Sequence, residues 1–417
     1  MISDKTLFLL TKTYPFGHGE QYITSELTFL AKLFKKVIIY PNDYYSENMI
    51  HDKLLPINVK VLNFNQILPS FSKNKLRDYL YIIKHSYSEF FKTDDKENFF
   101  KNFKWNLLNF WTQYQISIYF SKYLKDNNYN SHNAVFYSYW FHKSAILMAI
   151  LKDKKQINEF VSRAHSVDLY HQDWGIINEK IKVPPFKMLK LENVSKIICV
   201  SAHGANYLKN KYPQYAAKVM TQYLGVVNSS EQSSNMHDDV FRIMTCSGID
   251  TNKRVHKLAE ALVEIKYKVE WIHFGTGSLI NQLQDVVNYL PENISVDIKG
   301  ATPNADIHNY YKRNRIDLFV NLSIVEGLPV SIMEAMSYGI PILATEVYGT
   351  PEAVVDQKNG FLISVNFSIS SLIDKINYCI ENKSLLNEMR IYSRELFLEK
   401  YSAEKNYSQF ANYLSSL

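Results

Sequence analysis

Short runs of apolar and β-branched residues punctuate the whole chain and alternate with longer segments of helical period. This alternation predicts a parallel sheet covered by helices, because parallel strands need long crossover connections. The runs form two series, at 6–11, 36–41, 59–64, 134–140, 160–165 and 196–202, and then at 241–248, 269–277, 294–300, 317–323, 341–347 and 360–365. The pattern therefore predicts an α/β protein made of two Rossmann-like, doubly wound units that face each other across a cleft.

A polar segment separates the two series. Residues 228–239 read NSSEQSSNMHDD, a composition that is typical of a linker. The 417-residue chain is also longer than a single core usually grows. We expect a first domain at 1–227, a linker at 228–240, a second domain at 241–395 and a C-terminal helix at 396–417 that packs back on the first domain.

The composition narrows the classes of partner. A net charge of +6 permits an anionic substrate or an acidic membrane surface, and nothing indicates nucleic acid. No apolar stretch is long enough to span a bilayer, and the N-terminus lacks a signal-peptide core. The cysteines, at Cys199, Cys246 and Cys379, lack metal-ligand spacing. We therefore expect a cytoplasmic protein with reduced cysteines and no bound metal.

The segment VEGLPVSIMEAMSYG at 325–339 places Glu326 and Glu334 on either side of a strand-to-helix turn. Pro329 suits the first helical position and Gly339 the end, but no side chain at the start can cap the helix. The free backbone N–H groups of Gly327, Leu328 and Val330 suit a phosphate. Pro329 lies among them but has no N–H group. Glu334 would then reach an attached ribose and Glu326 a sugar at the other end. The alternative is an ordinary helix with one solvated glutamate and one loop glutamate.

A second candidate follows the run at 160–165. The segment SRAHSVDLY places His165 at the end of the expected strand and Asp168 just beyond it. A histidine at this position can donate to a sugar hydroxyl or stabilise a developing charge. The alternative is that His165 bonds a nearby backbone carbonyl.

The first strand leads into a glycine-containing loop, TKTYPFGHGEQYITSEL, in which Gly17 and Gly19 would let the backbone approach a ligand. Neither this loop nor the pair Gly275 and Gly277 completes a dinucleotide-binding G-x-G-x-x-G, and there is no Walker motif. A redox or nucleotide-hydrolysing function is therefore disfavoured. Gly17, Gly275 and Asp168 are secondary site candidates.

Taken in order along the chain, these segments resemble the retaining glycosyltransferases of family 4, which have the GT-B fold. The resemblance rests on YPFGHGEQYITSEL, SRAHSVDLY, VSAHGANYLKNKYP, LGV at 224–226, NKRVHKLAEAL, HFGTGSL and the E-x7-E block that continues through GIPILATEVYGTPEAVVDQKNGFLI. It spans nearly the whole chain, and the last block is the most specific part of it.

The resemblance implies roles for individual residues. Glu334 would hold the nucleotide ribose and Glu326 the donor sugar hydroxyls. His165 would lie near the reaction centre, so that the catalytic group would comprise His165, Glu326 and Lys253.

The same resemblance implies a phosphate site. Lys253, with Arg254 beside it, would neutralise the diphosphate leaving group, and Gly19 would let the first loop close on the phosphates. Many family members carry an arginine five residues before the lysine, whereas this chain has Gly248 there. Arg254 is the candidate substitute.

The implied reaction moves a sugar from a UDP- or GDP-sugar to a glycan or lipid-linked acceptor in polysaccharide, capsule or glycolipid synthesis, with retention of configuration. The adjacent acids at 94–95 and 238–239 do not form a D-x-D motif, so we expect neither a metal nor another cofactor. The alternatives are a non-catalytic GT-B subunit that binds a partner transferase, or a GT-B nucleotide-sugar epimerase or phosphorylase.

An insertion at 66–126 interrupts the first series and is helical in character. Within it, 101–120 is crowded with aromatic residues and flanked by lysines, which suits peripheral contact with the inner face of a membrane. Its apolar residues go nearly all the way round the expected helix, which instead favours a core helix packed on the first domain.

Overall fold

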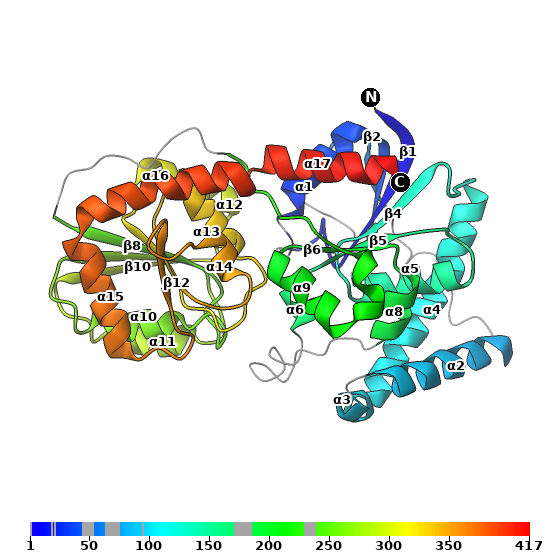
Figure 1. Cartoon of the computed structure of the whole chain (residues 1–417), viewed down its shortest axis with the longest axis horizontal. Coiled ribbons are helices and arrows are strands. Elements are labelled where there is room, and N and C mark those ends of the chain that lie inside the picture. The colour runs from blue at the N-terminus through cyan, green and yellow to red at the C-terminus, as the bar shows by residue number, and fades with distance from the viewer. Residues whose placement is uncertain are drawn as a thin grey trace.

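The protein folds around two parallel sheets that lie side by side (Figure 1). The structure is a computed structural model, and it describes residues 2–17, 20, 22–43, 54–62, 76–93, 96–170, 186–228 and 239–417. This architecture confirms the prediction of an α/β protein with two Rossmann-like units.

The first sheet has the strand order β3-β2-β1-β4-β5-β6-β7, and all of its pairings are parallel. Its strands are β1 (Ser3–Thr11), β2 (Phe34–Pro41), β3 (Val59–Val61), β4 (Ala134–Ser138), β5 (Val161–Ala164), β6 (Lys196–Cys199) and β7 (Val219–Thr221). The described helices around it are α1 (Ile23–Leu33), α2 (Leu76–Lys92), α3 (Lys96–Lys101), α4 (Phe103–Asp126), α5 (Lys143–Asp153), α6 (Ser166–Leu169), α8 (Lys187–Asn193) and α9 (Ala202–Lys211), with a 3₁₀ turn at Pro213–Lys218.

Both faces of this sheet are buried, which explains the unbroken apolar run in β1. Phe8 and Leu10 belong to the core that contains residues of α4, α5 and α8. Leu7 and Leu9 belong to the opposite core, with α1 and the C-terminal helix. Successive side chains of a strand point to opposite faces, so a strand covered on both sides needs apolar residues throughout.

The second sheet has the order β10-β9-β8-β11-β12-β13 and is also parallel. Its strands are β8 (Phe241–Cys246), β9 (Val269–Phe274), β10 (Ile294–Gly300), β11 (Leu318–Asn321), β12 (Ile342–Thr345) and β13 (Gly360–Ile363). Its helices are α10 (Val255–Leu262), α11 (Ile280–Val287), α12 (Asn304–Arg313), α13 (Val330–Ser337), α14 (Thr350–Ala353), α15 (Ile369–Glu381) and α16 (Lys383–Lys400).

The C-terminal segment differs from the single helix expected at 396–417. Residue 396 lies inside α16, and the chain breaks only after Lys400 before α17 (Ala403–Ser416) begins. This last helix packs against α1 of the first domain (Figure 1). Most of the expected linker at 228–240 lies outside the described residues.

The chain crosses between the two domains twice, and the two crossings are bonded to each other. Val226 N–H donates to the Tyr401 carbonyl at 2.9 Å, and Ala403 N–H donates to the Val226 carbonyl at 2.9 Å. Gly225 lies so close to Ala403 that a Cβ there would come within 2.4 Å of the Ala403 Cα. A side chain at residue 225 would therefore force the crossings apart.

The insertion is helical, although its parts at 66–75 and 94–95 lie outside the described residues. Helix α4 packs against α5, and Phe110, Tyr114 and Phe120 are buried in the first domain's core. Of the two readings of 101–120, the core helix therefore describes α4. Among the described residues, no helix is long and apolar enough to cross a membrane.

Glu352 of α14 ties the second domain to the first. Its carboxylate accepts the backbone N–H groups of Ala202 and His203, at 2.8 and 2.7 Å, and the Tyr223 hydroxyl at 2.9 Å. The two N–H groups open helix α9, where the helix dipole is positive and favours a carboxylate. Glu352 therefore acts as a clasp between the domains.

Replacing Glu352 with alanine is expected to loosen this clasp, because two N–H groups of α9 lose their acceptor. We expect a loss of roughly 1.5–3 kcal/mol of stability and a larger radius of gyration as the domains separate. Thermal unfolding and small-angle X-ray scattering would measure both effects. Glu346→Ala, at an exposed glutamate of the same domain, is the control. An unchanged radius of gyration in Glu352→Ala would contradict the clasp.

Candidate active site

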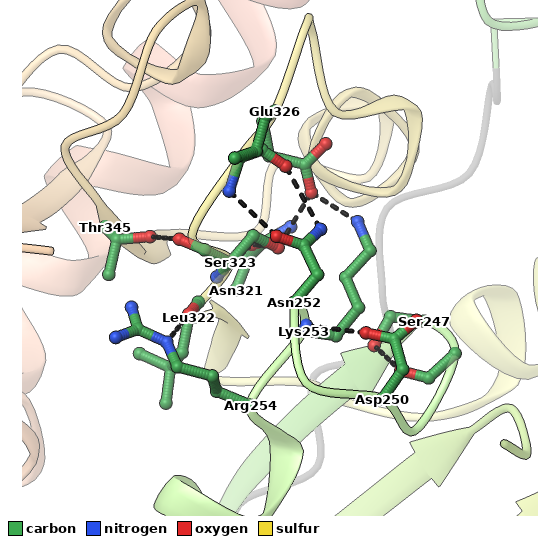
Figure 2. A network of polar contacts seen from close by, with 12 residues as sticks. Ser247, Asp250, Asn252, Lys253, Arg254, Asn321, Leu322, Ser323, Glu326 and Thr345 are labelled. Carbon is green, nitrogen blue, oxygen red and sulfur yellow. Dashed lines mark hydrogen bonds and ion pairs between the residues drawn. The ribbon is translucent and has the colours of Figure 1, made fainter. Parts of the chain in front are cut away.

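Glu326 lies in the loop that follows β11, and its carboxylate is largely buried. The Lys253 ammonium forms an ion pair with Glu326 Oε1, and the Ser323 hydroxyl lies 2.8 Å from the same oxygen (Figure 2). The structure therefore brings together two of the residues predicted to form the site, although 73 positions separate them in the sequence.

Asn252 holds the loop that carries Glu326. Its Nδ2 donates to the Val325 carbonyl at 3.1 Å, its Oδ1 accepts the Val325 N–H at 2.8 Å, and its own carbonyl accepts the Ile324 N–H at 2.9 Å (Figure 2). Asp250 in turn accepts the Lys253 N–H at 2.8 Å. The sequence analysis missed Asn252 and Asp250, whose only signal was their position beside Lys253.

Arg254 points away from the Lys253–Glu326 pair (Figure 2). Its guanidinium donates to the carbonyls of Leu322 and Val365, at 2.7 and 2.8 Å, and lies 4.8 Å from the centre of the Phe367 ring. These contacts give Arg254 a role in holding the loops together. The expectation that Arg254 supplements Lys253 at a phosphate stays a prediction.

Helix α13 begins one residue later than predicted, with Pro329 as its N-cap residue, and the Pro329 side chain makes no capping hydrogen bond. Gly339 follows the helix in a left-handed conformation, with φ of 69°, as expected of a residue that ends a helix. The N-terminus of α13 next to Gly327 and Leu328 thus offers backbone donors and a positive dipole end.

Glu334 lies on the second turn of α13 and is buried. Asn304 Nδ2 donates to Glu334 Oε1 at 2.8 Å, and His308 Nε2 lies 3.8 Å from the same oxygen. Burial raises the pKa of Glu334 to about 7, and the Asn304 hydrogen bond only partly offsets this effect. Near neutral pH the carboxyl is therefore poised to gain a charge when suitable donors arrive.

Glu334 lines a cavity of about 350 Å³ between the domains. The second domain contributes Asn304, His308, Val330 and Tyr338, and the first contributes Tyr22 and Ser25 from the start of α1. This volume falls within the roughly 300–1,000 Å³ that is usual for small-molecule sites. The cavity places the α13 carboxylate opposite the end of the glycine-containing loop.

His165 is buried at the end of β5, where its ring packs 4.2 Å from Trp140 and 5.2 Å from Tyr139, measured between ring centres. The Asp168 carboxylate accepts the backbone N–H of His165 at 3.0 Å and lies 3.7 Å from Nδ1 of the His165 ring. Neither ring nitrogen has a hydrogen-bond partner among the described residues. Burial lowers the pKa of His165 against the opposing effect of Asp168, so the ring is neutral at pH 7.

The loops that carry His165 and Glu326 meet across the domain boundary. A Cβ on Gly327 would lie 3.1 Å from the Ser166 backbone nitrogen. On the other side, a Cβ on Gly349 would lie 1.7 Å from the Gly327 carbonyl oxygen. A side chain at residue 349 would overlap the Gly327 carbonyl, whereas one at residue 327 would make a tight contact with Ser166. The approach of Gly327 to Ser166 brings the two predicted regions together.

The glycine candidates have separate outcomes. Gly19 lies outside the described residues. Gly17 has φ of 65° and open space around it. At Gly275 a Cβ would come within 1.8 Å of the Ser247 carbonyl oxygen, so this glycine is required by the packing of β9 against the end of β8.

Glu20, which the sequence analysis also missed, fixes the first loop. Its carboxylate accepts the backbone N–H groups of Thr13 and Tyr14, at 2.6 and 2.7 Å, and the Trp140 indole N–H at 2.5 Å. Because Trp140 packs on His165, Glu20 links the first loop to the His165 pocket. Within the described ranges, no group of three or more potential ligand side chains could hold a metal ion.

Comparison with known proteins indicates which class of protein this chain resembles. Residues 227–396 match the family model described as glycosyl transferases group 1. Over 163 residues, 38% of this chain, the protein is 29% identical to the poly(ribitol-phosphate) alpha-N-acetylglucosaminyltransferase of Staphylococcus aureus. The aligned region spans only 32% of that relative's length.

Solved structures extend the similarity to the whole chain. The sucrose-phosphate synthase of Thermosynechococcus elongatus superposes with a TM-score of 0.72 at 16% identity, covering 99% of this chain and 98% of that one. The Anabaena protein HepE in complex with UDP has a TM-score of 0.64 at 17% identity, covering 99% and 100%. The fold is GT-B, and the family match and the relative together support a glycosyltransferase of that fold.

Proposed function

We propose that the protein is a retaining, metal-independent glycosyltransferase that uses a nucleotide-diphosphate sugar, either a UDP- or a GDP-sugar, as donor. The observation that carries the proposal is the Lys253–Glu326 ion pair just before the N-terminus of α13, with the buried Glu334 carboxylate on the second turn of the same helix and at an interdomain cavity. A cation and free N–H donors suit a diphosphate, and carboxylates suit the hydroxyl groups of a ribose and a sugar.

In the proposed mechanism the diphosphate takes Lys253 as its counterion, and the α13 N–H groups stabilise the charge that develops as the glycosidic bond breaks. Glu326, which the Ser323 hydroxyl holds in place, accepts hydrogen bonds from the donor sugar hydroxyls. The neutral His165 ring donates a hydrogen bond to the same sugar from the other domain. The acceptor hydroxyl attacks on the face that the leaving group vacates, within the ion pair, and its proton passes to the departing diphosphate oxygen, so that configuration is retained. Positioning supplies the remaining rate enhancement.

For the acceptor we propose a glycan or lipid-linked glycan of a surface polysaccharide, capsule or glycolipid, used at the cytoplasmic side. The Staphylococcus aureus relative is named for transfer of N-acetylglucosamine to poly(ribitol-phosphate), and HepE was solved with UDP. These names favour a UDP-sugar donor and a cell-surface polymer as the first candidates to test.

Calorimetric titration with UDP, GDP, ADP and dTDP in the presence of EDTA tests the donor site. We expect one nucleotide to bind, and Glu334→Ala to weaken that binding roughly ten- to a hundredfold, because a charge-assisted hydrogen bond is lost. Glu346→Ala is the matched control. Binding of none of the four would contradict the proposal and favour a non-catalytic subunit.

A further inference from the structure

Helix α2 exposes an apolar face to solvent. Leu76, Leu80, Ile83, Tyr87 and Phe91 follow the three- and four-residue spacing of one helix face, and their exposed fractions are 75%, 58%, 62%, 66% and 55%. Single exposed apolar residues are normal on protein surfaces, whereas a row along one helix marks an interaction site.

The opposite face of α2 already anchors the helix to the protein. Asp78 accepts the Tyr114 hydroxyl at 2.5 Å, Ile82 is buried in the core, and Glu89 accepts the Met188 N–H at 3.1 Å. Packing and hydrogen bonds on this face explain why α2 is held against the domain. The exposed apolar row takes no part in these contacts of the described fold.

Helix α3 extends the apolar face. The rings of Tyr87 and Phe91 lie 4.4 Å apart, Phe90 is 5.1 Å from Phe91, and Phe100 of α3 is 4.8 Å from Phe90, measured between ring centres. Phe100 is itself 63% exposed. Both helices lie at the outer edge of the first domain, remote from the second (Figure 1). We call Leu76, Tyr79, Leu80, Ile83, Tyr87, Phe91 and Phe100 the α2–α3 face.

The exposed charges that the structure describes around the α2–α3 face are mostly basic. Exposed basic residues in 76–93 and 96–104 are Arg77, Lys84, Lys92, Lys96, Lys101 and Lys104, of which Lys92 pairs with Glu192 and Arg77 lies 3.7 Å from Asp78. The acids Asp78 and Glu89 are buried on the packing face, which leaves Glu97 as the exposed acid among the described residues of these ranges. An apolar row bordered by cations is complementary to an anionic surface with an apolar layer beneath it.

We propose that the α2–α3 face binds the surface of an anionic lipid bilayer, with α2 lying in the plane of the interface. Aromatic and aliphatic side chains enter the boundary between headgroups and acyl chains, and the lysines contact anionic headgroups. A second copy of the chain is a poorer occupant, because a twofold contact through this face would bring the two basic borders together.

This surface differs from the one that the sequence suggested. The segment 101–120 uses its aromatic residues mainly to pack α4 on the first domain, whereas the residues free to enter lipid lie on α2 and α3. Membrane binding through the α2–α3 face does not depend on the proposed activity. It would explain how a protein without a described spanning helix reaches a lipid-linked substrate.

Vesicle co-sedimentation with the full-length protein tests this inference. We expect binding to phosphatidylcholine vesicles that contain phosphatidylglycerol, weaker binding at high salt, and little binding to phosphatidylcholine alone. The triple variant Leu80→Ser, Ile83→Ser and Tyr87→Ser is expected to lower the partition coefficient by about tenfold or more. Replacing Lys84, Lys96 and Lys101 with glutamate is expected to act similarly, by roughly tenfold.

The second domain offers a control of the same composition. Leu398, Ile391 and Tyr289 are also exposed, and their replacement by serine removes a leucine, an isoleucine and a tyrosine remote from α2. Equal loss of binding in both triple variants, or no binding by the wild type, would overturn the inference. A dimer in light scattering that the α2 variant abolishes, without vesicle binding, would assign the face to a second copy instead.

Discussion

Lys253→Ala is expected to reduce kcat/KM for glycosyl transfer by about 10²–10³, because in the proposed mechanism the departing diphosphate loses its counterion in a partly buried site. The Lys253 side chain is 24% exposed, and its ammonium pairs with Glu326. The variant should also bind the nucleoside diphosphate more weakly, since the same charge contacts it before and after bond cleavage. Steady-state kinetics and calorimetry would separate the two effects.

Two neighbouring substitutions make this test specific. Lys257→Ala removes a lysine of α10 that pairs with Glu260 on the surface, and activity should be unchanged. Arg254→Ala removes contacts to the Leu322 and Val365 carbonyls, so we expect a lower melting temperature rather than a selective loss of diphosphate affinity. Full activity in Lys253→Ala would show that another group neutralises the leaving group.

Glu334→Gln is expected to abolish a pH dependence of nucleotide binding that the wild type shows around neutrality. Burial holds the pKa of Glu334 at about 7, so the carboxyl becomes a charged acceptor for ribose hydroxyls only as the pH rises through that value. Affinity of the wild type should increase between pH 6 and 8, while the variant should bind roughly ten- to a hundredfold more weakly at pH 8. Titration of the ligand phosphate affects both proteins equally, so the difference between their profiles reports Glu334.

Ionisation of the Glu334 carboxyl should lower the stability of the folded protein at alkaline pH. Its pKa is raised in the folded protein from 4.5 to about 7, so the folded state binds more protons between these values and stability falls as the pH rises through them. Glutamine cannot ionise. At pH 8 the variant should therefore be more stable than the wild type by at most about 3 kcal/mol, with a difference near zero at pH 4.5. Equal melting temperatures at pH 8 would contradict the raised pKa.

Much of the fold follows from the sequence because both sheets are covered on two sides. The buried centre of β1, at residues 7–10, and most of β8 are therefore apolar, and such runs are conspicuous. The edge strand β7 (Val219–Thr221), which has three residues of which one is buried, was not predicted. The break between α16 and α17 was missed as well, since the segment has no proline or glycine there to mark it.

A residue of the candidate site could be predicted only where the neighbouring sequence marks its position. Glu326, Glu334 and Lys253 lie next to strand ends and helix starts, which sequence patterns locate. Arg254 and Lys253 are adjacent and both basic, and only the backbone conformation, with Arg254 at φ of 48°, turns their side chains apart. Asn252 bonds backbone groups of Val325, 73 positions away, and Glu20 accepts the Trp140 indole N–H, 120 positions away, so no pattern along the chain indicates them.

The packing of α17 on α1 has a consequence for synthesis on the ribosome. Ile23, Leu27 and Leu30 of α1 share a core with Phe410, Ala411 and Leu414, which are translated only after the whole second domain. Domains usually fold as they emerge, in order from the N-terminus. Here the first domain has to wait with one face of α1 uncovered until the second domain has been made. The first domain is thus completed only after the second, and chains stalled before α17 is made should be the ones that chaperones retain.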